Sequence, residues 1–302
     1  MVVRPRPTPL QLLFILRGSI VPRIAPQIIG FAIYGAAVVL LTRALGIDFG
    51  GYGLAPFTLL GVTLSIYLGF RNNAAYDRWW EARKLWGQLV FDIRNLARSA
   101  TTLIPEQTGQ TRPLLMGALA FCHFLRGQLR NVDVKSEAGQ FLGQEIESIL
   151  VHANRGDATI RRMGQRLATL KHGGHIDAMD YRILDERLST LVALQAGCER
   201  IASTPLPFAY ALLLLRSAYI FCLLLPFGMA STLGWLTPLL SAVVAYSFFG
   251  LDALSEELEE PFGTEANDLP LDRMCRICEI SVFEALGEKP PQALKEVDFY
   301  SS

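Results

Sequence analysis

The sequence predicts an all-α membrane protein with four transmembrane helices and a large helical cytosolic region. Of its 302 residues, 51% are hydrophobic, and the mean hydropathy is +0.30, which exceeds that of an average soluble protein. Two stretches, Phe49–Phe70 and Ser217–Leu251, contain no charged residue, and a helix needs about 20 apolar residues to cross a bilayer. Because soluble domains rarely contain two such stretches, a large soluble core is the weaker interpretation.

The four predicted spans follow from these stretches. Pro26–Thr42 is free of charge and predicts the first span, and Phe49–Phe70 predicts the second. The third and fourth are expected as a hairpin, near Pro207–Leu225 and Leu233–Gly250, with an uncharged loop at Pro226–Ser231. This hairpin is inferred because the long second stretch is interrupted by helix-breaking residues, namely Pro226, Gly228, Gly234 and Pro238.

Basic residues orient the spans, since arginine and lysine concentrate in cytoplasmic segments. They precede the first span and follow the second, at Arg4, Arg6, Arg17, Arg23, Arg71, Arg78, Arg83 and Lys84. Both termini and the middle of the chain are therefore expected in the cytoplasm. The predicted parts are an interfacial segment, two transmembrane helices, a cytosolic helical region, a transmembrane hairpin and a cytosolic C-terminal helix with a tail, at residues 1–25, 26–70, 71–204, 205–251 and 252–302.

The cytosolic region has the periodicity of packed helices. Two sets of apolar residues recur at the spacing of one helix face. The first set is Leu85, Leu89, Ile93 and Leu96, and the second is Leu184, Leu188, Leu191 and Leu194. Turn-forming residues gather at Pro105–Pro113 and Lys171–Gly174, which predict loops. A formal net charge of zero gives no indication of a nucleic-acid partner.

Two neighbouring ridges run along the second span. Gly61, Ser65 and Gly69 are spaced four apart and form a ridge of small residues that lets helices approach closely. Beside it lies a ridge of large apolar residues, Val62, Ile66 and Phe70. If several copies of this helix surrounded one axis, the large ridge would form an apolar constriction, and such constrictions gate ions by dewetting. From periodicity alone, ordinary packing within the membrane is the favoured explanation of both ridges.

Other polar residues suggest rival functions. Asp268 and Asp272 have the spacing of paired carboxylates that bind magnesium, and an enzyme using them is one alternative. A non-conducting membrane scaffold is another. Arg216 stands inside the third span, where charges are costly and often functional, so it is a candidate charge in a water-filled vestibule. Cys275 and Cys278 form a single CxxC motif, and the five cysteines are expected to be free thiols.

Five segments of the chain resemble the bacterial members of the bestrophin family. The strongest is RNNAAYDRWWEARKLWG, and SIYLGF is similar to the family's pore helix. In chain order the five segments are Leu12–Ile20, Ser65–Phe70, Arg71–Gly87, Ala196–Tyr210 and Glu259–Asp272. The resemblance implies a homopentameric ion channel in the bacterial inner membrane, with four membrane helices per subunit and no enzymatic activity.

The resemblance also assigns residues. Val62, Ile66 and Phe70 fall at the family's three neck positions, and Ile183 is the nearest match to its cytosolic aperture. The calcium clasp of animal members corresponds to Glu260, Glu265 and Asp268, but its run of aspartates is interrupted here by Thr264, Ala266 and Leu269. Since calcium requires six to eight oxygen ligands, we expect no cofactor and an acidic helix cap instead.

The permeating ion is expected to be monovalent. Animal bestrophins pass anions and have aromatic residues at two neck positions, whereas this chain has only Phe70. Aromatic rings present positive edges, so one ring instead of two weakens the attraction for chloride. Some prokaryotic relatives pass monovalent cations such as sodium. The sign of the ion stays open, with cations slightly favoured.

Overall fold

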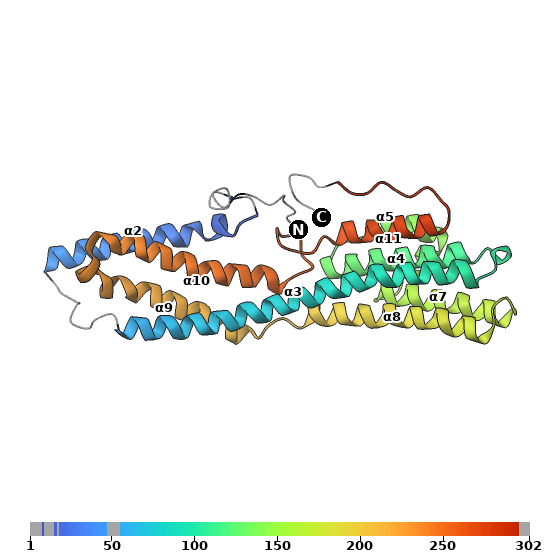
Figure 1. The fold of residues 1–302 in the computed structure, drawn as a ribbon, viewed down its shortest axis with the longest axis horizontal. Helices are drawn as coiled ribbons and strands as arrows, with labels where there is room; N and C mark the ends of the chain where they lie inside the picture. The colour runs from blue at the N-terminus through green and yellow to red at the C-terminus, as the bar shows by residue number, and fades with distance from the viewer. Residues whose placement is uncertain (1–7, 9–14, 17, 47–54, 296–302) are drawn as a thin grey trace. The chain divides into compact units, whose positions relative to one another are not determined.

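Helices account for all the regular secondary structure that the computed structural model describes, which covers residues 8, 15–16, 18–46 and 55–295 (Figure 1). The chain divides into two compact units. We call Arg4–Trp79 with Pro205–Pro261 the apolar unit. We call Met1–Val3, Trp80–Thr204 and Phe262–Ser302 the polar unit. Helix α3, Ala55–Leu103, contributes its first part to the apolar unit and the rest to the polar unit.

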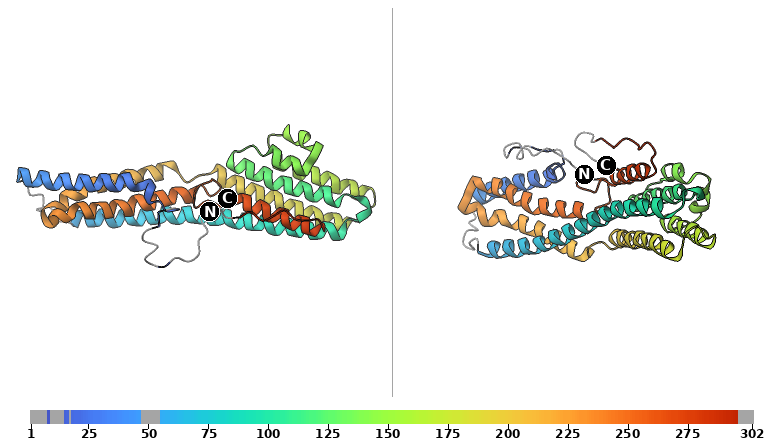
Figure 2. Two further views of the ribbon diagram at one scale, coloured as in Figure 1. Left: turned by 90° about the horizontal axis from the view of Figure 1, so that it is seen from above. Right: turned by 45° about the vertical axis from the view of Figure 1, so that its right-hand side comes forward.

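Four helices build the apolar unit, and they lie side by side in all three ribbon views (Figures 1 and 2). They are α2 (Val21–Leu45), the first part of α3, α9 (Phe208–Leu233) and α10 (Thr237–Glu259). Their core is almost entirely aliphatic and aromatic, and it includes Phe31, Leu68, Ala245 and Phe249. Within the described residues, Val21–Leu45 and Phe208–Glu259 are long and apolar enough to cross a membrane by length and composition.

Two glycines permit the close approach of helices in this unit. A Cβ atom at Gly35 of α2 would lie 3.1 Å from Cα of Pro238 in α10. A Cβ atom at Gly228 of α9 would lie only 2.4 Å from Cε2 of Phe57 in α3. A larger residue at either position would push the helices apart, so these glycines fix the spacing of the unit.

The hairpin turns later than the sequence predicts. The expected loop at Pro226–Ser231 is wrong, because α9 continues through Pro226 to Leu233. The chain reverses in the short 3₁₀ helix η4, Gly234–Leu236, where Gly234 has a φ of 52° that favours glycine. Proline is tolerated inside membrane helices, although it has no N–H to donate to the carbonyl four residues earlier, here that of Cys222. The Tyr34 hydroxyl of α2 donates to the next carbonyl, that of Leu223, at 3.1 Å, and so joins α2 to this turn of α9.

The polar unit is a bundle around α4, Thr111–Arg130, in which every residue from Leu114 to Gly127 is buried. Helices α5 (Lys135–Leu142), α7, α8 and α11 contact α4. Its remaining elements are α6 (Ile146–Leu150), α7 (Arg155–His172), α8 (Ala178–Ser203), α11 (Leu271–Ala285) and the 3₁₀ helices η2 (Glu106–Thr108) and η3 (Gly143–Glu145).

Both apolar faces predicted for this region are largely confirmed. Leu184, Leu188, Leu191 and Leu194 are buried on α8, and Leu89, Ile93 and Leu96 are buried on α3. Leu85 is only half-buried, and it packs next to Gly197 of α8. The expected breaks also occur, because α3 ends at Leu103 and α7 ends at His172. Most of the interfacial segment predicted within residues 1–25, and the start of the predicted second span at 49–54, lie outside the described residues.

Candidate functional site

The ridge of large apolar residues on α3 faces away from the core of the apolar unit. Leu64 and Leu68 form the buried stripe of this helix segment, at 5% and 1% exposure. At about 100° per residue, Ile66 lies about 200° around the helix from Leu64. Val62, Ile66 and Phe70 are accordingly 54%, 52% and 60% exposed. No other helix of the described chain covers this ridge, which is therefore left open on the surface of the apolar unit.

The ridge of small residues lies between the buried stripe and the large ridge. A Cβ atom at Gly61 would lie 3.2 Å from Cζ of Phe221, so Gly61 packs against α9 of its own chain. Ser65 is exposed and its hydroxyl donates to the carbonyl of Gly61, at 2.8 Å. Gly69 has no atom within 4 Å of its would-be Cβ position. The ridge is therefore used within the chain at one end and open at the other.

A buried ion pair fixes the rotation of α3 directly after Phe70. Arg71 is 5% exposed, and its guanidinium donates to the carboxylate of Asp252 in α10. A second carboxylate, that of Glu259, lies 3.7 Å from Arg71. Because Arg71 faces α10, the adjacent Phe70 side chain is held about 100° around the helix from that contact, with Ile66 and Val62 in line above it.

Further polar contacts join the same ends of these helices. Arg23 of α2 pairs with Glu256 at 2.6 Å, and Arg78 of α3 donates to the carbonyl of Glu259 at 2.6 Å. From the sequence, Arg71 is predicted only as one of the basic residues that orient the spans, and its pairing with Asp252 is not predicted. A signal was present, because Arg71 and Asp252 are each the first charged residue after a charge-free stretch.

Arg216 lies on the exposed face of α9, and among the described residues it makes no hydrogen bond or ion pair. The position of Arg216 along α3 follows from two contacts of α9, one on either side of Arg216 in the sequence. The Tyr210 hydroxyl donates to the carbonyl of Tyr67, at 3.0 Å, and Phe221 packs on Gly61. Since α3 and α9 are antiparallel, Arg216 lies at the depth of the large apolar ridge but on a different helix.

Most of the remaining predicted residues belong to the polar unit. Ile183 is half-buried near the start of α8. Asp268 is 3% exposed, and its carboxylate accepts the backbone N–H of Glu265 at 2.6 Å. It therefore caps a turn, and the N-cap of α11 is Pro270. Glu260 follows the last residue of α10 and is exposed. Within the described parts of the chain, no three acidic, histidine or cysteine side chains are placed to hold a metal ion.

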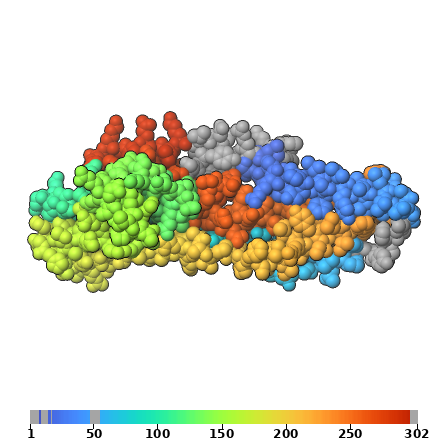
Figure 3. All heavy atoms as spheres, turned by 180° about the vertical axis from the view of Figure 1, so that it is seen from behind, coloured from blue at the N-terminus to red at the C-terminus, as the bar shows by residue number. Residues whose placement is uncertain are grey.

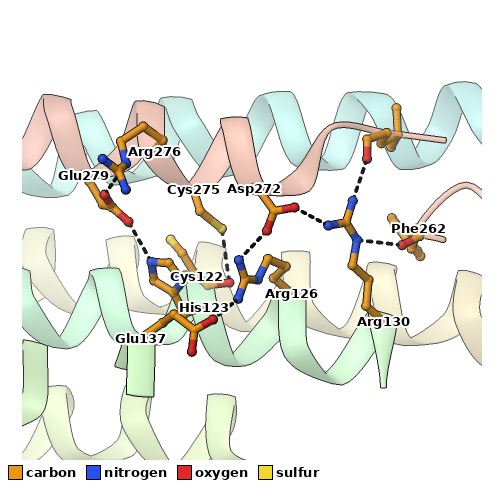
Figure 4. Close-up of polar contacts among 11 residues, drawn as sticks. Cys122, His123, Arg126, Arg130, Glu137, Phe262, Asp272, Cys275, Arg276 and Glu279 are labelled. Atoms are coloured by element: carbon orange, nitrogen blue, oxygen red, sulfur yellow. Dashed lines mark hydrogen bonds and ion pairs between the residues drawn. The ribbon is translucent and has the colours of Figure 1, made fainter. Parts of the chain in front are cut away.

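The carboxylate of Asp272 is not available for magnesium. One oxygen accepts from Arg126 and the other from Arg130 (Figure 4). Two arginines compensate this charge and occupy both oxygens, so the residue joins α11 to α4. In the same region His123 and Glu279 are 2.8 Å apart and buried. The interpretation of Asp268 and Asp272 as an enzyme's metal-binding pair is therefore wrong.

The cysteines are free thiols, as expected. Cys122, Cys275 and Cys278 lie together in the core of the polar unit. A hydrogen bond with Cys278, together with burial, raises the pKa of the Cys122 thiol well above its ordinary value. Burial also raises the pKa of Cys275. Protonated, buried thiols are poor metal ligands and poor nucleophiles, which indicates that the CxxC motif packs the core.

These features define a class of protein: an all-helical membrane protein with an exposed apolar ridge on a helix held in place by a buried ion pair. Comparison with known proteins identifies the family. The model of the family described as bacterial/fungal bestrophin protein matches residues 1–284. The chain belongs to this family.

Named relatives match the chain over nearly their full lengths. A voltage-dependent anion channel-forming protein of Mesorhizobium japonicum is 63% identical over 100% of this chain and 97% of the relative. The voltage-dependent anion channel-forming protein YneE of Escherichia coli is 40% identical over 95% of each chain. A bacterial bestrophin homologue from Klebsiella pneumoniae, solved by crystallography, superimposes with a TM-score of 0.83 at 36% identity, over 90% of this chain and 100% of the other. Such names indicate a channel and not an enzyme.

Proposed function

We propose that this chain is one subunit of a homopentameric channel that passes monovalent ions across the bacterial inner membrane. Ions move along the axis at which five copies of α3 meet. Four helices per subunit, α2, α9, α10 and the first part of α3, lie in the bilayer, and both termini are in the cytoplasm. The arginine positions that orient the spans and membership of the bestrophin family support this proposal.

The observation that carries the proposal is the uncovered apolar ridge of α3. Val62, Ile66 and Phe70 are each more than half exposed, while the opposite face of the helix is buried. In a ring of five helices these residues form a neck about two turns long, and Ile183 forms a second constriction in the cytosolic region. A narrow apolar neck excludes water until it widens slightly, so a small movement of α3 opens or closes the channel.

Monovalent cations are the favoured ions. Phe70 supplies a single ring of positive aromatic edges at the neck, and Val62 and Ile66 supply none. The neck therefore attracts anions less than a neck with two aromatic rings. Anions are the second candidate, and the names of the relatives from Mesorhizobium japonicum and Escherichia coli favour them.

The test is the reversal potential of the purified protein in a lipid bilayer with a tenfold gradient of sodium chloride. An ideally selective channel gives a potential of about 59 mV in magnitude at 25 °C. The sign that corresponds to sodium supports the first candidate, and the sign that corresponds to chloride supports the second. A complete absence of current, in protein that is folded and pentameric, contradicts the channel proposal and favours a scaffold.

A further inference from the structure

An apolar groove runs along the surface of the apolar unit between α3 and α9. Its volume is about 390 Å³, within the range of small-molecule binding pockets. The lining residues are mostly apolar and include Leu60, Tyr67, Leu213 and Ile220. Figure 3 shows α9 at the surface with α3 beside it. No described segment of the chain fills this groove.

The length of the groove matches one leaflet of a bilayer. On α9 the lining extends from Tyr210 to Phe221, which is about 16 Å at about 1.5 Å per residue. The hydrocarbon layer of one leaflet is about 15 Å thick. At the end of the groove near Phe208, Tyr67 and Tyr210 are joined by the hydrogen bond from the Tyr210 hydroxyl to the Tyr67 carbonyl. Tyrosines are enriched where membrane helices meet the headgroups.

Arg216 lies at the edge of this groove. Leu213 and Ile220, which line it, are the i−3 and i+4 neighbours of Arg216 on the surface of α9. Helical side chains tilt toward the helix N-terminus, so the guanidinium can extend toward Phe208 and the headgroup level, as long basic side chains do in membranes. It has no hydrogen-bond or ion-pair partner within the described chain, and a cation at this depth requires an anionic one.

We propose that the groove binds one acyl chain of an anionic phospholipid, whose phosphate pairs with Arg216. The protein contributes the apolar wall of the groove and the cation, and the lipid contributes the anion that Arg216 lacks. A lipid of the cytoplasmic leaflet fits because the Phe208 end of α9 faces the cytoplasm, and this assignment rests on the topology given under Proposed function. A lipid at this position contacts the pore helix α3 at Thr63 and Tyr67, which border the large apolar ridge as the i−3 neighbours of Ile66 and Phe70.

Lipid adducts counted by native mass spectrometry test the proposal. The full-length protein in detergent is titrated with palmitoyl-oleoyl phosphatidylglycerol or, in parallel, with palmitoyl-oleoyl phosphatidylcholine. We expect more phosphatidylglycerol adducts, and about fivefold weaker phosphatidylglycerol binding in Arg216→Gln, as for the loss of one basic residue near an anionic headgroup. Arg216→Lys should keep the preference. Arg43→Gln is the matched control, because it removes an exposed arginine of α2 that stacks on Trp235, away from the groove.

A second variant tests the groove itself. Thr63→Leu with Ser217→Leu places bulk at two lining positions and should weaken phosphatidylglycerol binding while leaving the charge intact. Unchanged binding in Arg216→Gln overturns the proposal, as does unchanged binding in the filled variant. A change of oligomer mass in Arg216→Gln would show that the arginine contacts another copy instead, which also overturns it. Adducts are counted without any ion current, so a failure of this proposal and a failure of the channel proposal are distinguishable.

Discussion

The ion pair between Arg71 and Asp252 should dominate the stability of the apolar unit. Replacing Asp252 by Asn keeps the shape of the side chain and removes its charge. Arg71 is then left as a buried cation, since its side chain is only 6% exposed. The remaining carboxylate, Glu259, is 3.7 Å away and compensates it poorly.

The expected cost is about 3 kcal/mol of unfolding free energy. Removing one partner of a buried ion pair typically costs about 3–5 kcal/mol. We expect the lower end of that range, because Asp252 retains 19% side-chain exposure and Glu259 remains nearby. Replacing both partners, with Arg71→Met and Asp252→Leu, should cost much less than the single change, since no charge is then left without a partner.

Chemical unfolding of the purified protein in detergent, followed by circular dichroism, measures this cost. The control is Glu256→Gln, which breaks the pair with Arg23. That pair is half exposed on both sides, at 47% and 59%, and should contribute about 0–1 kcal/mol. If Asp252→Asn destabilises the protein no more than Glu256→Gln does, the pair does not hold α3 in place and the reasoning about its rotation fails.

Three further predictions concern packing and charge. Gly228→Ala should cost about 1–3 kcal/mol of stability, because the added Cβ would overlap the Phe57 ring. Gly30→Ala is the control and should cost nothing, because there is open space around Gly30. Equal melting temperatures of the two variants would contradict this prediction. Asp272→Ala should cost about 3 kcal/mol by leaving Arg126 and Arg130 without their shared carboxylate, and a loss of less than about 1 kcal/mol in urea unfolding would refute it. Burial raises the pKa of Asp92 above its ordinary value, and Gln88 and Arg187 only partly offset this. The folded protein therefore binds this proton more tightly than the unfolded chain, and stability falls as pH rises from the ordinary pKa to the raised one. Asp92→Asn should accordingly raise the melting temperature at pH 7 and lose that advantage near about pH 4; a melting temperature at pH 7 equal to that of the parent would contradict it.

Helix positions were predictable from the sequence because charge-free stretches and leucine periodicity report burial directly. Leu184 and Leu188 were placed correctly on a buried face for this reason. The turn of the hairpin was not predictable, since proline breaks helices in water but is tolerated inside membrane helices, and α9 continues through Pro226 to Leu233.

The apolar ridge of α3 was also visible in the sequence, but its exposure was not. Periodicity places Val62, Ile66 and Phe70 in line, yet only the packing of Leu64 and Leu68 shows which face of the helix the chain leaves open. The contact from Arg71 to Asp252 joins residues 181 positions apart, and the sequence marks it only by making each the first charged residue after a charge-free stretch. The same holds for Arg126 and Asp272, whose separation hid the fact that the carboxylate was already occupied.

The central claim is that ions cross the membrane through a neck formed by Val62, Ile66 and Phe70. Single-channel conductance in planar bilayers tests it, with all three residues replaced by Ala. The matched control replaces Ile29, Ile33 and Leu40 by Ala, three exposed apolar residues of α2. The claim predicts a larger conductance for the neck variant and a parental conductance for the α2 variant. A neck variant that conducts as the parent does would contradict it.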